Sequence, residues 1–165
     1  MKQGATFDSS FWINSHRSGL LPYVLERYDV SFCRDVATEL DPTFPSGAQF
    51  WSLVALNKLV EVNPVDILIN EFGRGERAAI SLAVENREWI LLIDDLRPFQ
   101  LAARLGVNAV CTPVLVVDLF SVERLDAKEA LVILARLATL QTISPTLLAA
   151  ALAQLGRVFS KGTGG

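Results

Sequence analysis

The sequence predicts an α/β fold with a largely parallel β-sheet. Short apolar segments typical of strands alternate with longer segments that favour helix, and this alternation is typical of β–α–β units. Residues 89–93 form a continuous apolar run, which is expected of a parallel strand that is covered on both faces. Because crossovers between parallel strands are right-handed, we expect helices on both faces of the sheet.

The chain begins with a strand that is followed by a helical segment. Residues 3–7 are predicted to form a short strand. Residues 11–27 have helical character, with interruptions near Gly19 and Pro22. We therefore expect helix, broken at these two residues, between the first strand and the second.

A second short strand is predicted at residues 30–33. Asp35 is placed to cap a short helix behind it, and this helix contains Glu39. The motif DPTFP predicts a turn, because it combines two prolines with an aspartate. Apolar side chains then recur at helical spacing over residues 48–60, which predicts a longer helix.

The middle of the chain is partly ambiguous. Residues 64–72 are compatible with a strand at VDILI or with a short helix. Residues 76–85 are rich in strong helix formers and predict a helix. The apolar strand at residues 89–93 is followed by a helix at 97–105, for which Gly106 is the stop signal.

The last third of the chain contains one further strand and three helices. The strand is predicted at residues 107–111 and the first helix at residues 113–122. Asp126 and Glu129 have the spacing of a capping box before a second, apolar helix. Ser144 is placed to cap the final helix.

Length and composition suit an ordinary globular domain. The chain has 165 residues, of which 51% are apolar and 20% charged, so the composition argues against a disordered protein. We expect one domain over residues 1–160 and a flexible tail at residues 161–165. The net charge of −3 argues against a general nucleic-acid coat protein, so any such binding must be local.

The sequence also limits the class of cofactor and the compartment. Cys33 and Cys111 lie far apart in apolar segments, without the spacing of a zinc site, so we expect buried free thiols. The N-terminus has no apolar signal region, and no apolar run approaches the roughly 18 residues of a membrane helix. We therefore expect a soluble, cytoplasmic protein without a membrane span.

Four acidic residues stand where a metal-dependent nuclease would need them. Asp8 and Asp95 directly follow strand-like segments, and the carboxyl ends of parallel strands meet at one rim of the sheet. Glu76 opens a predicted helix beside that rim, and Glu39 lies in the short helix after the second strand. Because side chains alternate in extended chain, either Asp94 or Asp95 should point to the rim, and the spacing does not say which.

If these acids converge, they can share a divalent cation. Two carboxylates about 4 Å apart repel by roughly 4 kcal/mol at an effective dielectric near 20, so either a pKa rises or a metal ion binds. Ligand sets made only of oxygen select Mg²⁺ or Mn²⁺, and these ions support phosphodiester hydrolysis. The ordinary alternative is that each acid caps a helix or interacts with its dipole.

Basic residues flank the same segments. A planar guanidinium suits phosphate oxygens, so the arginines predict a positive rim around a negative centre. The alternative is that each arginine is a solvated surface residue or an ion-pair partner. His16 has no serine or cysteine partner in a hydrolase motif, which favours a surface or supporting role. The arginines concerned are Arg17, Arg34, Arg74, Arg77 and Arg97.

The motifs that carry these acids resemble those of PIN-domain proteins. The run DSSFWINSHRSGLLPYVLERYDVSFCRDVATEL resembles the opening of that family, in which an Asp-Ser/Thr pair ends the first strand and a Glu lies in a later short helix. The run GRGERAAISLAVENREWILLIDDLRPFQLAARLGVNAVCTPVLV is similar to a PIN-like subgroup best known among prokaryotic toxin-like proteins. The segment ISPTLLAAALAQLG resembles the C-terminal helix of that subgroup.

This resemblance implies a three-layer α/β/α sandwich on a parallel sheet of four or five strands, and a ribonuclease that depends on Mg²⁺ or Mn²⁺. By position, the four family acids match Asp8, Glu39, Glu76 and Asp95. Asp94 could contribute to the metal site or support it. Substrate contacts are expected from Ser9, which matches a small hydroxyl residue of the family, and from Arg74, Arg77 and Arg97.

The chain departs from the family pattern in two places. Alanines follow Glu76 where related sequences often carry a second acid, which leaves Glu76 as the only candidate for the third ligand. Residues 41–63 match poorly, and this stretch often contacts substrate or partner in such proteins, so the RNA specificity cannot be predicted.

The leading functional hypothesis is a PIN-like endoribonuclease, the toxin of a VapC-type pair, restrained by a small antitoxin. The alternative is a non-catalytic PIN-like module that binds RNA or protein. A Rossmann-like nucleotide binder fits poorly, because no glycine-rich phosphate loop follows a predicted strand. Trp12, Phe50 and Trp51 either form a homodimer or antitoxin surface or lie in the core.

Overall fold

The computed structural model describes residues 1–162, and its sheet is parallel throughout. The strand order is β3-β2-β1-β4-β5. This arrangement confirms the predicted α/β fold with a parallel sheet of four or five strands. The five strands are β1 (Gln3–Phe7), β2 (Tyr28–Phe32), β3 (Val60–Glu61), β4 (Ile90–Leu92) and β5 (Asn108–Val110).

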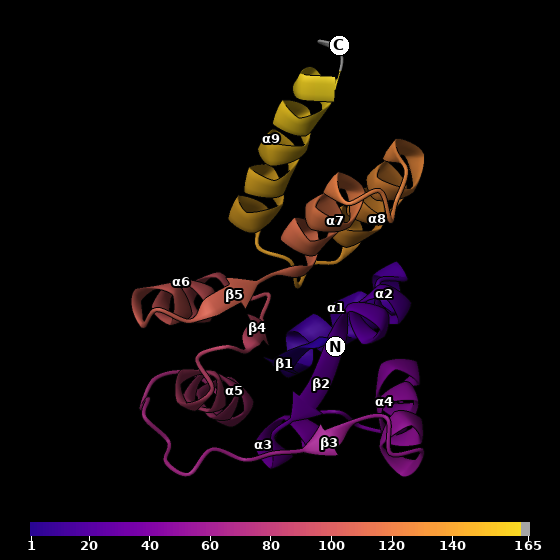
Figure 1. Ribbon diagram of the computed structural model, residues 1–165. Coiled ribbons are helices and arrows are strands. Elements are labelled where there is room, and N and C mark those ends of the chain that lie inside the picture. The colour runs from indigo at the N-terminus through magenta and orange to yellow at the C-terminus, as the bar shows by residue number, and fades with distance from the viewer. Residues whose placement is uncertain (163–165) are drawn as a thin grey trace.

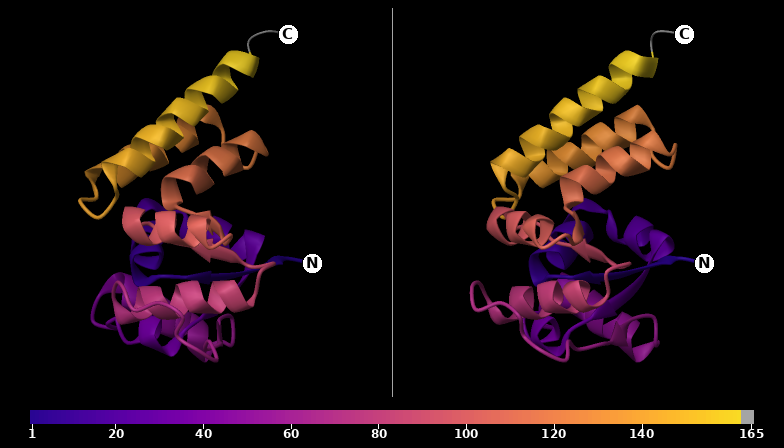
Figure 2. Two further views of the ribbon diagram at one scale, coloured as in Figure 1. Left: turned by 90° about the vertical axis from the view of Figure 1, so that its left-hand side faces the viewer. Right: turned by 60° about the vertical axis from the view of Figure 1, so that its left-hand side comes forward.

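Helices cover both faces of the sheet. Figure 1 shows α1, α2 and α4 on one side and α5 and α6 on the other, as right-handed crossovers require. Beyond β5, α7 packs against both α8 and α9, and Figure 2 shows α9 extending past the rest of the molecule. The helices are α1 (Ser9–Ser18), α2 (Leu21–Arg27), α3 (Arg34–Ala37), α4 (Pro45–Ala55), α5 (Arg74–Glu85), α6 (Leu96–Arg104), α7 (Thr112–Ser121), α8 (Ala127–Thr139) and α9 (Pro145–Gly162).

An aromatic cluster joins the sheet to α1 and α4. Phe50 lies at its centre, with ring centroids 5.5 Å from Trp12 and 4.9 Å from Phe32. Phe7 contacts both rings, with centroids 5.0 Å from Trp12 and 6.3 Å from Phe50. Trp12 and Phe50 are therefore core residues and do not form a partner surface, whereas Trp51 keeps 39% of its surface exposed.

The helix predicted at residues 48–60 is wrong at both ends. Helix α4 begins at Pro45, whose fixed φ suits the first helical position. It ends at Ala55, and Asn57 adopts a left-handed conformation with φ of 53°. The chain can then extend, and Val60 pairs with Ser31 of β2. An edge strand therefore replaces the last turn of the predicted helix.

Residues 64–72 form neither the strand nor the helix that their sequence allows. The backbone N–H groups of Val65 and Asp66 donate to the carboxylate of Glu85, at 2.9 and 3.1 Å. The N–H of Leu68 donates to the hydroxyl of Ser81 at 3.0 Å. Because side chains of α5 satisfy these donors, the segment needs no regular hydrogen bonding of its own.

The ends of the helices follow local signals in most places. Gly19 has φ of 84° and caps the C-terminus of α1, which explains the predicted break. The predicted capping box of α8 is confirmed, because Asp126 accepts from the N–H of Glu129 at 2.7 Å and Glu129 accepts from the N–H of Asp126 at 2.8 Å. Asp35 does not cap α3; it lies inside the first turn of that helix.

Both cysteines are buried and free, as the sequence predicts. Burial raises the pKa of the Cys33 and Cys111 thiols to about 12, which makes them poor nucleophiles. Helix α9 continues to Gly162, and the rest of the tail expected at residues 161–165 lies outside the described residues. Within residues 1–162, no helix combines the length and the apolar character needed to cross a membrane.

Candidate metal centre

Three acidic side chains converge at the carboxyl end of the sheet. Strands β1 and β4 are parallel neighbours, with Phe7 paired to Leu92, so the residues that follow them share one rim. Asp8 follows β1, and Asp95 precedes α6. Glu76 reaches the same rim from the first turn of α5. One oxygen of each acid lies within 4.8 Å of the others, and we call Asp8, Glu76 and Asp95 the acid cluster.

Asp8 is the most deeply buried member of the acid cluster, with 1% of its surface exposed. Its Oδ1 accepts from the N–H of Phe11 at 2.9 Å, so Asp8 also caps α1. Its buried Oδ2 has no hydrogen-bond partner. Burial raises the pKa of Asp8 well above its usual value, the Phe11 N–H partly offsets this, and the nearby carboxylates raise it further.

Glu76 is half-buried and held by the start of its own helix. Its Oε2 accepts from the N–H of Gly73 at 2.9 Å. Burial raises the pKa of Glu76 to about 7, and proximity to Asp95 and Glu39 adds to the rise. Burial, with the repulsion of the neighbouring acids added, therefore favours a proton on Glu76 near neutral pH unless a cation balances the charge.

Asp94 lies outside the acid cluster and is held by buried hydrogen bonds. Its Oδ2 accepts from the Asn14 amide at 2.7 Å, and its Oδ1 accepts from the N–H of Thr112 at 2.6 Å. The Thr112 hydroxyl adds a third bond, at 3.0 Å to Oδ2. Burial raises the pKa of Asp94 to about 6 although these donors oppose the rise. Asp95 thus faces the cluster and Asp94 faces the core.

Asn14 and Thr112 were not identified from the sequence. Asn14 is fully buried, and its carbonyl accepts from the Thr142 hydroxyl at 2.7 Å. This network ties α1, the end of β4, the start of α7 and the loop before α9 into one unit. A usable signal was present, because Asn14 is a polar residue directly after the apolar segment Phe11–Ile13 at the start of a helix.

Glu39 also lies outside the acid cluster, and it does not lie inside a helix as predicted. Helix α3 ends at Ala37, so Glu39 stands in the turn that follows. The hydroxyl of Ser9 donates to Oε2 of Glu39, and the N–H of Gly75 donates to Oε1 at 3.1 Å. Glu39 therefore ties the start of α1 to the start of α5, one residue before Glu76.

Arg97 is the arginine that lies beside the acid cluster. It lines a cavity of about 420 Å³ together with Glu76 and Asp95. Its guanidinium stands 5.8 Å from the ring centre of Phe72, which also lines this cavity.

Arg74 and Arg77 occupy a different position. They line a separate cavity of about 280 Å³ together with Asp35. Arg74 is exposed and lies 3.9 Å from the carboxylate of Asp35. The Nε of Arg77 is buried and has no hydrogen-bond partner. Of the three arginines expected to contact substrate, the structure therefore places Arg97 at the acid cluster and Arg74 and Arg77 away from it.

Comparison with known families agrees with this geometry. A family model described as a PIN domain matches residues 5–157. The chain belongs to the PIN-domain family. Proteins of this family are generally nucleases, so the chain has a nuclease-type fold with an acidic rim where a metal ion could bind. No curated protein matches the chain.

The acid cluster has the chemistry of a divalent-cation site. It offers carboxylate oxygens alone, which suits a hard ion such as Mg²⁺ or Mn²⁺ and does not suit zinc. The unpaired Oδ2 of Asp8 is a buried acceptor without a donor, and a cation would satisfy it. The residues present therefore fit the metal ion of PIN-domain nucleases.

Proposed function

We propose that this protein is a Mg²⁺- or Mn²⁺-dependent endoribonuclease and the toxin of a VapC-type toxin–antitoxin pair. One observation carries the chemistry: Asp8, Glu76 and Asp95 converge, and one buried carboxylate oxygen of Asp8 has no partner. These three residues would hold the ion. When bound, the ion would polarise the phosphodiester and lower the pKa of a water molecule.

The remaining residues have positioning and binding roles in this proposal. Asp94, fixed by Asn14 and Thr112, holds the backbone from which Asp95 projects. Glu39 orients the start of α5 through the N–H of Gly75. Arg97, which lines the cavity with Glu76 and Asp95, would bind the substrate phosphate with its planar guanidinium. In this assignment Glu39 and Asp94 act through their neighbours and do not bind the metal ion.

Cleavage of RNA by purified variants tests the nuclease assignment. We expect the wild-type chain to cleave single-stranded RNA with Mn²⁺ or Mg²⁺ and not with EDTA. Asp8→Asn and Asp95→Asn should each reduce the rate by at least about 100-fold, as expected for the loss of a charged group that stabilises the reaction. Asp29→Asn is the matched control, because Asp29 is exposed on β2 away from the rim. Metal-dependent cleavage that survives both site substitutions would sink the proposed centre.

The toxin assignment needs its own test. We propose that a small antitoxin protein restrains the enzyme and that the chain forms a homodimer. Exposed apolar side chains support a partner surface, with Trp51 exposed at 39%, Val65 at 88% and Leu68 at 54%. Expression of the wild type in a bacterial host should arrest growth, and Asp95→Asn should not. Light scattering tests the homodimer, and a monomer at high concentration would exclude it.

A further inference from the structure

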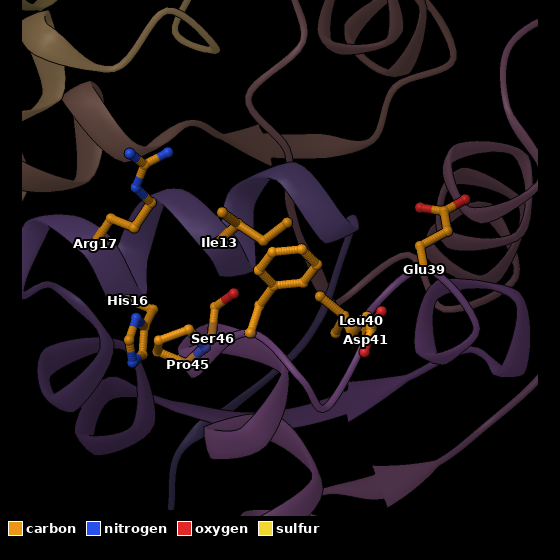
Figure 3. A pocket seen from close by; sticks show the side chains of 9 residues that line it. Ile13, His16, Arg17, Glu39, Leu40, Asp41, Pro45 and Ser46 are labelled. Carbon is orange, nitrogen blue, oxygen red and sulfur yellow. The ribbon is translucent and has the colours of Figure 1, made fainter.

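A large cavity lies between α1 and the segment that joins α3 to α4. Its volume is about 710 Å³, within the range of roughly 300–1,000 Å³ that is typical of small-molecule sites. Figure 3 shows Ile13, His16 and Arg17 on α1, with Glu39 at the far end. We call this cavity the α1–α4 pocket, and none of the roles given above uses it.

The walls of the α1–α4 pocket are fixed by buried hydrogen bonds and close packing. The indole N–H of Trp12 donates to the carbonyl of Ser46 at 2.9 Å. The indole N–H of Trp51 donates to the carbonyl of Leu40 at 2.8 Å. A Cβ on Gly47 would lie 1.9 Å from the carbonyl oxygen of Asp41, so this turn closes only around glycine. The pocket is thus preformed, and a ligand would not have to order it.

The lining of the pocket combines an aromatic ring, a cation and a fixed acceptor. Phe44 keeps 63% of its surface exposed although it lines a concave, largely apolar site. Arg17 is exposed and forms no ion pair within residues 1–162. Hydrogen bonds from the N–H and hydroxyl of Thr43 lower the pKa of Asp41, so its carboxylate is an acceptor at neutral pH. A nucleotide offers the matching groups: a flat base, donors on its edge, and a phosphate.

One end of the pocket reaches toward the acid cluster, because Glu39 lines the pocket and also accepts from the N–H of Gly75, the residue before Glu76. One face of α1 points along this direction. It carries Ser9 and the residues four, seven and eight positions after it, which are Ile13, His16 and Arg17. At one end Ser9 donates to Glu39, which borders both the pocket and the start of α5. Arg17 lies about 12 Å further along the helix axis. A strand whose phosphate lies at the acid cluster can therefore place a neighbouring nucleotide in the pocket.

We infer that the α1–α4 pocket binds an unpaired nucleobase of a single-stranded RNA substrate, with Phe44 stacked on the base and Arg17 on the adjacent phosphate. This inference rests on the proposed ribonuclease function and adds the substrate class to it. A base within a duplex is paired and stacked on both sides, so the pocket selects single strands.

A binding cycle that combines a protein variant with a modified RNA tests this inference. All proteins are full-length and carry Asp95→Asn, so that the RNA stays intact. We expect Phe44→Ala to weaken binding of a short unstructured RNA about 10-fold, in line with the contribution of one stacked base. For the parent protein, an RNA with one abasic residue at the matching position should bind more weakly by the same factor. The two losses should not add, because both remove the same contact.

Matched variants separate stacking from general damage. Phe44→Tyr keeps the ring and should bind as tightly as the parent. Leu56→Ala removes an apolar side chain that is 66% exposed and lies outside the pocket, and it should change nothing. Arg17→Gln should weaken binding of every RNA and reduce its salt dependence.

The outcomes distinguish this inference from the proposed nuclease function. Equal affinity of the Phe44→Ala variant, or fully additive losses at every abasic position, would overturn the base pocket even if the wild type cleaves RNA. Base-dependent binding through Phe44, together with a wild type that cleaves no RNA in the cleavage assay, would support the pocket and overturn the nuclease. Absence of any RNA binding would overturn both.

Discussion

The carboxyl group of Asp8 is buried with one oxygen unpaired, and burial raises its pKa. At pH 8 this group is ionised in the unfolded chain, so burying it in the metal-free protein costs free energy. Asn has nearly the same shape, keeps an acceptor for the N–H of Phe11 and carries no charge. We therefore expect Asp8→Asn to raise the Tm of the metal-free protein at pH 8 by at least about 2–4 °C, which corresponds to roughly 1 kcal/mol in a chain of this size.

Calorimetry of the wild type and Asp8→Asn, each with and without Mn²⁺, tests whether Asp8 lowers the stability of the metal-free protein and binds the metal ion. Mn²⁺ should raise the Tm of the wild type and leave that of Asp8→Asn unchanged, because the variant lacks the buried ligand. A wild type that is more stable than Asp8→Asn in EDTA at pH 8 would show that the unpaired oxygen has a stabilising partner in solution.

Gly75 allows Glu39 to approach the start of α5. A Cβ on this residue would lie 2.7 Å from Oε1 of Glu39, which is closer than atoms in contact allow. We expect Gly75→Ala to displace Glu39, lower stability by about 1–3 kcal/mol and slow RNA cleavage. The variant should lose more in cleavage rate than in Mn²⁺ affinity, because Glu76 itself is retained. Equal cleavage rates of Gly75→Ala and the wild type would exclude a positioning role for Glu39.

Among the elements, those with strong local signals were predicted well. Helix α5 consists of strong helix formers, and β4 is an uninterrupted apolar run, so neither depends on distant residues for its identity. Residues 48–60 and 64–72 were not predicted well, because tertiary contacts decide them. Val60 extends because β2 offers an edge, and the loop that includes Val65 is held by Glu85. A single sequence does not show these partners.

The candidate site also has some features that the local sequence predicts and others that depend on distant residues. The rim position of Asp8 and Asp95 follows from the order of the strands, because each acid comes after an apolar strand that can be recognised in the sequence. The orientation of Asp94 depends on Asn14 and Thr112, which are far away in the chain. The α1–α4 pocket depends on how the turn after α3 folds over α1, and no local pattern indicates it.

Helix α9 offers a prediction at the element scale. Gly156 lies inside this helix, and an added Cβ would meet no atom within 4 Å. Glycine in a helix interior is less favourable than alanine by roughly 0.5–1 kcal/mol. Gly156→Ala should therefore raise the Tm by about 1–4 °C without changing cleavage or RNA binding. A lower Tm would mean that a partner or a second copy packs closely against this face.

For the whole molecule, the buried acids predict an unusual dependence of stability on pH. In the folded chain the pKa of Glu76 is about 7 and that of Asp94 about 6, and that of Asp8 is also raised. In the unfolded chain these groups titrate near pH 4. Between these values the folded state binds more protons than the unfolded state, so the free energy of unfolding falls as pH rises from about 4 to 7. The Asp94 shift alone corresponds to about 3 kcal/mol.

We therefore expect the Tm of the metal-free protein to fall by on the order of 10 °C between pH 5 and pH 8. A divalent ion should oppose the trend, because it binds the ionised carboxylates and its binding releases protons. At about 100 times its Kd, Mn²⁺ should add about 2.7 kcal/mol at pH 8 and much less at pH 5. Thermal unfolding across this range, in EDTA and in Mn²⁺, measures both effects. A Tm that rises with pH in EDTA would show that the cluster is ionised and balanced by the protein itself, and the case for a metal centre would then fail.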